Sequence, residues 1–133
     1  MKTLIVEDDF TSRFILQEIL GTSHVAVNGV EAISAVKAAL EENKPYDLIC
    51  LDIMMPEMDG QQALVEIRRL EKQHGFPLGK GAKVLMTTAL SDRKNILKAF
   101  REQCDGYIVK PIDENRILKQ LKELRIVKKE RID

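Results

Sequence analysis

The chain has 133 residues, and its 21 basic side chains balance its 21 acidic ones. A neutral chain offers no overall field that would favour nucleic acid or an anionic membrane surface as a partner, so we expect neither. The length suits one domain with its own core. Because no run approaches the ~18 apolar residues of a membrane span and no secretory signal begins the chain, we expect a cytoplasmic protein.

Short apolar runs alternate along the chain with longer segments of helical period, which is typical of βαβ units and a parallel sheet. We expect strands at 3–7, 24–27, 47–52, 82–88 and 106–109, and helices at 10–20, 30–43, 59–73, 92–103 and 113–128. The strand at 24–27 is short and ends at the turn signal Asn28-Gly29, so it is predicted at an edge of the sheet. Five strands and five helices predict a three-layer α/β sandwich.

Helix start signals and one apolar face support these helices. Asp59, Ser91 and Asp113 are predicted to cap the three later helices, and Gln62 completes a capping box with Asp59. In the last helix the helical period predicts one buried face, formed by Ile117, Leu118, Leu121 and Leu124.

Two features of the sequence are predicted to carry no chemistry. Cys50 and Cys104 lie in apolar contexts without CxxC spacing, so we expect buried, reduced thiols. The Gly- and Pro-containing connection at 74–81 is expected to be a surface loop. Its Gly79-Lys80-Gly81 precedes a strand, whereas a phosphate-binding loop follows a strand and opens a helix.

Polar side chains stand at the carboxyl ends of four predicted strands. Glu7 and Asp8 follow the first strand, and Asp52, Thr88 and Lys110 stand at the ends of three later ones. All strands of a parallel sheet end at one edge, which is where ligands bind in open sheets of this kind. If these strands are neighbours, the five polar groups share one pocket.

The chemistry of this pocket favours a divalent cation and a phosphoryl group. Three carboxylates would repel each other, and because no His or Cys lies at this edge, Mg²⁺ or Mn²⁺ is expected rather than zinc. The acidic groups Glu7, Asp8 and Asp52 sum to about −3, and the cation with Lys110 supplies about +3. Asp52 would then attack phosphorus as the nucleophile. The cation, Lys110 and the Thr88 hydroxyl would hold the phosphoryl oxygens.

Each of these residues also has a structural explanation. Asp9 is predicted to be only a helix N-cap. Thr88 could serve packing alone, Lys110 could be solvated, and Pro111 could simply end a strand. Jointly, their order and their positions at successive strand ends favour a site.

With these motifs in hand, the chain resembles a receiver domain of two-component response regulators. The resemblance covers residues 1–127 and leaves 128–133 as a charged C-terminal tail. It rests on four segments: Leu4-Ile5-Val6-Glu7-Asp8-Asp9, the run from Asp47 to Gly60, Met86-Thr87-Thr88-Ala89, and Gly106-Tyr107-Ile108-Val109-Lys110-Pro111. It implies a flavodoxin-like, doubly wound α/β fold with a five-stranded parallel sheet in the order 2-1-3-4-5 and five helices.

The resemblance also implies roles for the residues of the site. Asp52 matches the phosphoacceptor, Asp8 the principal metal-binding carboxylate and Glu7 the second acidic group, while the backbone carbonyl of Met54 matches a further metal ligand. Lys110 matches the lysine that contacts the phosphoryl group.

Two further residues match the switch of the family. Thr88 matches the switch hydroxyl and Tyr107 the switch aromatic, while the Lys110-Pro111 bond is expected to be cis. When Thr88 turns toward the phosphoryl group, Tyr107 would rotate inward and change the surface formed by the helix at 92–103, the strand at 106–109 and the last helix. Tyr107 as a static aromatic remains the alternative.

The resemblance implies a single-domain regulator that is phosphorylated by a sensor histidine kinase and signals by binding a downstream effector protein. We expect a monomer when unphosphorylated, with dimerisation left open for the phosphorylated form. A phosphorelay shuttle and a phosphorylation-independent pseudo-receiver scaffold are the alternatives. Turnover of an external substrate is not expected, because Met54 occupies the position where such phosphotransferases carry a second acid. Apolar Met54 and Leu90 are predicted to slow loss of the phosphoryl group.

Overall fold

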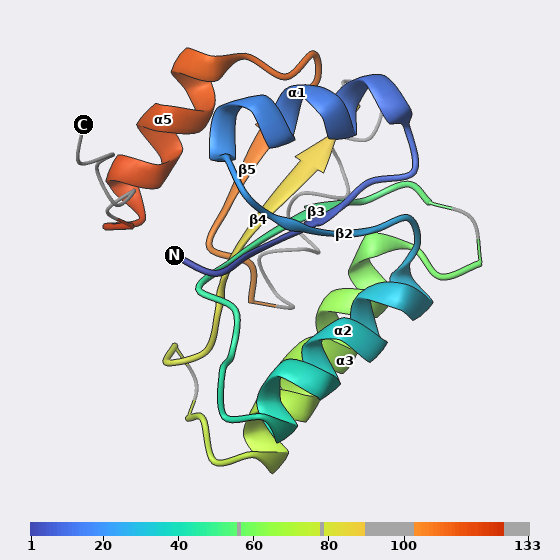
Figure 1. Ribbon diagram of the computed structural model, residues 1–133, viewed down its shortest axis with the longest axis vertical. Coiled ribbons are helices and arrows are strands. Elements are labelled where there is room, and N and C mark those ends of the chain that lie inside the picture. Colours follow the sequence, from blue (N-terminus) through green and yellow to red (C-terminus); the bar gives the residue numbers. More distant parts are fainter. Residues whose placement is uncertain (56, 78, 90–102, 127–133) are drawn as a thin grey trace.

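The computed structural model describes residues 1–55, 57–77, 79–89 and 103–126. Within these residues the chain forms one parallel sheet in the order β2-β1-β3-β4-β5, as predicted. The strands are β1 (Thr3–Val6), β2 (His24–Ala26), β3 (Leu48–Asp52), β4 (Lys83–Thr88) and β5 (Gly106–Val109), and the helices are α1 (Phe10–Leu20), α2 (Gly29–Glu41), α3 (Gly60–Gln73) and α5 (Glu114–Glu123). Helices α1 and α5 cover one face of the sheet, and α2 and α3 cover the other (Figure 1).

Most predicted elements lie within one or two residues of their predicted bounds. The predicted helix at 92–103 and its cap Ser91 lie outside the described residues, apart from residue 103. The four described helices therefore account for four of the five that were predicted.

The last helix differs from its prediction in two respects. It ends at Glu123 rather than at residue 128, because Leu124 is its C-cap and Arg125 adopts a left-handed φ of 59° that stops the helix. Its buried face is narrower than the sequence pattern indicates, since Ile117 and Leu121 are buried but Leu118 is 40% exposed. A single helix packed at the side of a sheet buries only a narrow stripe, and Leu118 lies outside it.

Side-chain caps fix where the described helices begin. Asp9 and Asn28 accept hydrogen bonds from backbone N–H groups of the first turns of α1 and α2. Asp59 and Gln62 form the predicted capping box at the start of α3, and Asp113 caps α5. These caps satisfy backbone donors that would otherwise lack partners at the helix ends.

The core consists of two apolar layers, one on each face of the sheet. Leu48 and Cys50 of β3 pack toward α1 and α5, whereas Ile49 and Leu51 pack toward α2 and α3. This alternation follows from the two-residue period of a strand. Both Cys50 and Cys104 are buried free thiols, as predicted, and burial raises the pKa of Cys50 to about 12.

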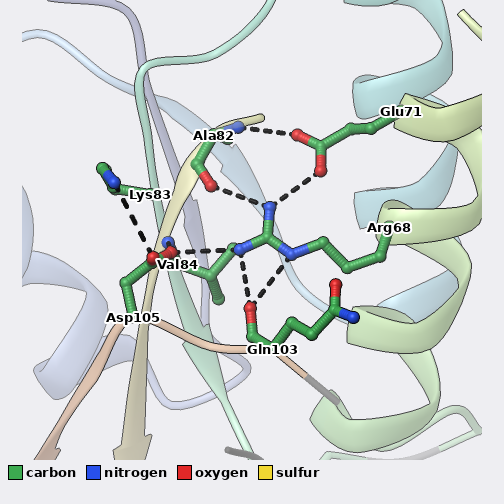
Figure 2. A network of polar contacts seen from close by, with 7 residues as sticks. All are labelled: Arg68, Glu71, Ala82, Lys83, Val84, Gln103 and Asp105. Atoms are coloured by element: carbon green, nitrogen blue, oxygen red, sulfur yellow. Dashed lines mark hydrogen bonds and ion pairs between the residues drawn. The ribbon is translucent and has the colours of Figure 1, made fainter. Parts of the chain in front are cut away.

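A polar network lies at the amino-terminal edge of the sheet (Figure 2). Asp52 ends β3 and therefore lies at the opposite edge. Its centre is Arg68 of α3, which donates hydrogen bonds to the carboxylates of Glu71 and Asp105 and to the carbonyls of Ala82 and Gln103. The Glu71 carboxylate in turn accepts a 2.6 Å hydrogen bond from Ala82 N. The network joins α3 to the residues that precede β4 and β5.

Among the residues that the structure describes, no helix has both the length and the apolar character needed to cross a membrane.

Candidate functional site

The predicted site residues meet at the carboxyl edge of the sheet. Glu7 follows β1, Asp52 ends β3, and Lys110 follows β5. The Lys110 ammonium, Nζ, lies 2.7 Å from Glu7 Oε1 and 3.3 Å from Asp52 Oδ2. Glu7 is fully buried and Asp52 is 4% exposed, so two carboxylates and one lysine meet where water has little access.

Asp8 completes a cluster that can hold a metal ion. Glu7, Asp8 and Asp52 each offer a carboxylate oxygen, and these oxygens lie within 4.8 Å of one another. The buried Oε1 of Glu7 has its ion pair with Lys110 but no hydrogen bond within the described residues. Three oxygen donors at this spacing fit a hard divalent cation that keeps several bound waters.

The electrostatics of the cluster show why a cation is favourable. Burial and the neighbouring Glu7 carboxylate raise the pKa of Asp52 to about 7, although Lys110 opposes the shift. Burial alone would lower the pKa of Lys110, but Glu7 and Asp52 outweigh it and the pKa is raised. Lys110 therefore stays charged, while two carboxylates compete for a single positive charge.

The turn that carries the acidic residues is held by the start of α1. Asp9 accepts a 2.9 Å hydrogen bond from Ser12 N as the N-cap, which confirms its predicted structural position, and this bond lowers the pKa of Asp9. The Arg13 guanidinium donates a 3.0 Å hydrogen bond to the Glu7 carbonyl. Nothing in the sequence pattern predicts this role of Arg13, because only the helix geometry brings a side chain six residues along the chain back onto this turn.

The turn after Asp52 is fixed by close packing of α3. Gly60 N donates a 2.8 Å hydrogen bond to the Ile53 carbonyl, and a Cβ at residue 60 would overlap the Asp52 carbonyl oxygen. Met54 N lies 3.3 Å from Asp52 Oδ1, and its side chain is 58% exposed. The predicted role of the Met54 carbonyl as a metal ligand stays a prediction.

The two predicted switch residues lie on the strands that end beside the site, Thr88 at the end of β4 and Tyr107 within β5. Thr88 is fully buried, and its hydroxyl donates a 3.1 Å hydrogen bond to the Ala89 carbonyl. Tyr107 of β5 is 38% exposed. The Lys110-Pro111 bond is cis, as predicted. The roles of Thr88 and Tyr107 as a switch stay predictions.

Fold and site together define a flavodoxin-like α/β domain with a carboxylate cluster and a lysine at the carboxyl edge of its sheet. Residues 3–122 match the profile of the response regulator receiver domain family. The chain belongs to this family, the receiver domains of two-component response regulators.

Individual relatives agree with this assignment. The chain is 33% identical over 128 residues to the chemotaxis protein CheY of Listeria monocytogenes, an alignment that covers 92% of this chain and 97% of that protein. It is 38% identical over 129 residues to hybrid signal transduction histidine kinase B of Dictyostelium discoideum, where the alignment covers 90% of this chain but only 6% of the kinase. The receiver domain thus occurs among these relatives both as nearly a whole protein and as a small part of one.

A solved structure shows the same fold. The CheY-like response regulator receiver domain protein of Methanospirillum hungatei superposes with a TM-score of 0.73, and the alignment covers 93% of each chain at 26% identity.

Proposed function

We propose that this receiver domain accepts a phosphoryl group on Asp52 from a sensor histidine kinase in a reaction that requires Mg²⁺. The contact between Lys110 and both buried carboxylates is the observation that carries the proposal. A buried cluster with more negative than positive charge is poised to take up a cation and a phosphoryl group together. Mn²⁺ has the same preference for oxygen ligands and would serve as a substitute.

Each residue of the cluster has a distinct role in this proposal. Asp8, Glu7 and Asp52 would hold the metal, with the Met54 carbonyl as a further ligand, and the metal would neutralise charge on the transferring phosphoryl group. Asp52 is the nucleophile: one of its carboxylate oxygens would bond to phosphorus as the bond between phosphorus and the donor breaks. The other oxygen would become the carbonyl oxygen of the aspartyl phosphate and would stay within reach of the metal. Lys110 is already charged and is placed to pair with a phosphoryl oxygen.

The phosphoryl group would then change the state of the switch. In the present conformation the Thr88 hydroxyl is bonded to the Ala89 carbonyl, which is a weaker acceptor than a charged phosphoryl oxygen. Exchange of that bond for one to the phosphoryl group would favour inward rotation of Tyr107 and a changed surface around β5 and α5. A downstream effector protein would bind this surface.

The domain would act as a phosphoacceptor rather than as an enzyme with an external substrate. The residue two positions after Asp52 is Met54, so no second carboxylate stands there to act as a general acid. We expect a monomer before phosphorylation.

Phosphorylation by a small donor tests the proposal. Incubation with acetyl phosphate and Mg²⁺ is expected to add one phosphoryl group, about 80 Da by intact mass. EDTA should abolish the gain, and D8N should require much more Mg²⁺. The matched control is D9N, which keeps a capping side chain outside the cluster and should behave as the wild type. No mass gain in the wild type with any donor would contradict the proposal.

A further inference from the structure

The side chains at the ends of β3 and β4 lie on different faces of the sheet. Successive side chains of a strand point to opposite faces. Cys50 of β3 and Leu85 of β4 both pack in the core under α1 and α5. Two residues further along the same strands, Asp52 and Thr87 therefore belong to this face. Thr88, one residue later, belongs to the other face.

The strand register makes Thr87 the direct neighbour of Asp52. The Cα atoms of Asp52 and Thr87 are partners in the parallel β3–β4 pair. On the other side of β3, Val6 is the partner of Leu51, so Glu7 stands beside Asp52 there. Asp52 is therefore flanked by a carboxylate on one side and by a hydroxyl on the other, each one strand spacing of about 4.8 Å away.

The Thr87 hydroxyl is buried and has no hydrogen-bond partner among the described residues. Thr87 is 1% exposed, and its Oγ1 has no hydrogen bond within the described residues. A buried hydroxyl without a partner is unfavourable, so such a group calls for an explanation. A small apolar residue such as valine would fill the same volume without this penalty.

Within the part of the chain that the structure describes, Asp52 accepts no short hydrogen bond. Its two described contacts with donors, Lys110 Nζ and Met54 N, are both 3.3 Å long. Bonds to a charged carboxylate are normally shorter, at about 2.7–2.9 Å. The carboxylate can therefore accept a further donor from the side that faces β4.

We propose that Thr87 is a positioning residue of the site. Rotation about the Thr87 Cα–Cβ bond brings the hydroxyl to the adjacent carboxylate, where it donates a hydrogen bond to the oxygen that does not attack phosphorus. This bond fixes the plane of the carboxylate, so that the other oxygen faces the open edge of the sheet. The inference rests on the proposed function and adds a second threonine whose task differs from that of Thr88.

A pair of variants that differ only in the hydroxyl tests this inference. T87S keeps the hydroxyl and T87A removes it, while both lose the methyl group. T87V removes the hydroxyl and keeps the shape. The control is T3V. Thr3 of β1 also has a buried hydroxyl for which the described residues offer no partner, and it lies at the opposite end of its strand from Glu7.

Binding is measured without phosphoryl transfer, from the rise in melting temperature on addition of Mg²⁺ and BeF₃⁻, and the rate of phosphorylation by acetyl phosphate is measured separately. T87A and T87V are expected to bind Mg²⁺ with BeF₃⁻ about tenfold more weakly than T87S and the wild type, with a similar loss in rate. T3V should match the wild type in both measurements.

Two results would separate the inference from the proposed function. Equal binding and rates in T87S and T87A would overturn the role of Thr87, even if the wild type is phosphorylated normally. Failure of the wild type itself to bind Mg²⁺ with BeF₃⁻ or to accept a phosphoryl group would instead contradict the proposed function.

Discussion

At the scale of single residues, Asp52 has an unfavourable environment for a charged group. It is 4% exposed, and the Glu7 carboxylate beside it is fully buried. Both effects raise the pKa of Asp52 to about 7. A side chain placed in this way reduces the stability of the metal-free protein near neutral pH and is therefore better explained by chemistry than by folding.

The raised pKa predicts how stability depends on pH. Because Asp52 binds a proton more readily in the folded chain than in the unfolded chain, its stabilising contribution is present below the unfolded pKa of 3.8 and is lost as pH rises through about 7. In EDTA, D52N should therefore be more stable than the wild type by about 1–3 kcal/mol at pH 8, and this advantage should shrink at pH 5. Denaturant unfolding at the two pH values measures the difference. The same pH dependence in D52N and the wild type would show that another group is responsible.

Met54 predicts a slow loss of the phosphoryl group. Its exposed side chain lies next to Asp52 and offers no polar atom that could orient an attacking water. Leu90, the other residue of this prediction, lies outside the described residues. Replacing both residues by Asn or Glu should speed hydrolysis of the aspartyl phosphate by about tenfold, because a polar side chain can position water. The decay of the phosphorylated mass over time measures this, and an unchanged decay rate would refute the prediction.

At the scale of elements, the packing of α3 on the end of β3 shapes the site. The helix begins at Gly60, where a Cβ would overlap the Asp52 carbonyl oxygen. G60A should therefore lower the free energy of unfolding by about 2–4 kcal/mol, since backbone must move to relieve the overlap. It should also slow phosphorylation by displacing Asp52. Q62A, which removes half of the capping box but leaves the close contact intact, should have a much smaller effect on phosphorylation. Wild-type rates in G60A would show that the close packing does not position Asp52.

The bounds of helices and strands could be predicted from the sequence where a particular side chain marks the end of an element. Capping residues such as Asp59 and Asp113 mark a helix start in the local sequence, and short apolar runs indicate strands. The end of α5 and the exposure of Leu118 were mispredicted, because both depend on what the helix packs against. Strand order came from the family resemblance rather than from periodicity.

The site could be predicted only in part for a related reason. Glu7, Asp8, Asp52 and Lys110 stand at strand ends, and a parallel sheet must bring those ends to one edge. The hydrogen bond from Arg13 to the Glu7 carbonyl depends on how the turn between β1 and α1 folds, and the sequence does not show this. The relation of Thr87 to Asp52 depends on strand register, which the sequence does not reveal.

At the scale of the whole molecule, the carboxyl edge of the sheet holds the site, whereas the amino-terminal edge holds a network that stabilises the fold. The carboxyl edge concentrates charges that oppose each other around Asp52. The amino-terminal edge carries the network of Arg68, in which two acidic residues and two carbonyls accept from one guanidinium (Figure 2). We interpret this network as a source of stability that offsets the unfavourable charges at the carboxyl edge without taking part in the site.

This separation predicts opposite effects of mutations at the two edges. R68M should lower the free energy of unfolding by about 2–4 kcal/mol, because it leaves the buried Glu71 carboxylate without its cation. At a temperature where R68M remains folded, its rate of phosphorylation should match the wild type. R69M, which removes an exposed ion pair with Glu66, is the matched control and should lower the free energy of unfolding far less than R68M does. A large loss of phosphorylation rate in folded R68M would show that the two edges are coupled.

The location of the phosphoryl group tests the account most directly. After reaction with acetyl phosphate and Mg²⁺, peptide mass spectrometry should find a single phosphoryl group, on the peptide that contains Asp52, and D52N should carry none. A phosphoryl group on any other residue of the wild type, or undiminished labelling of D52N, would contradict the central claim.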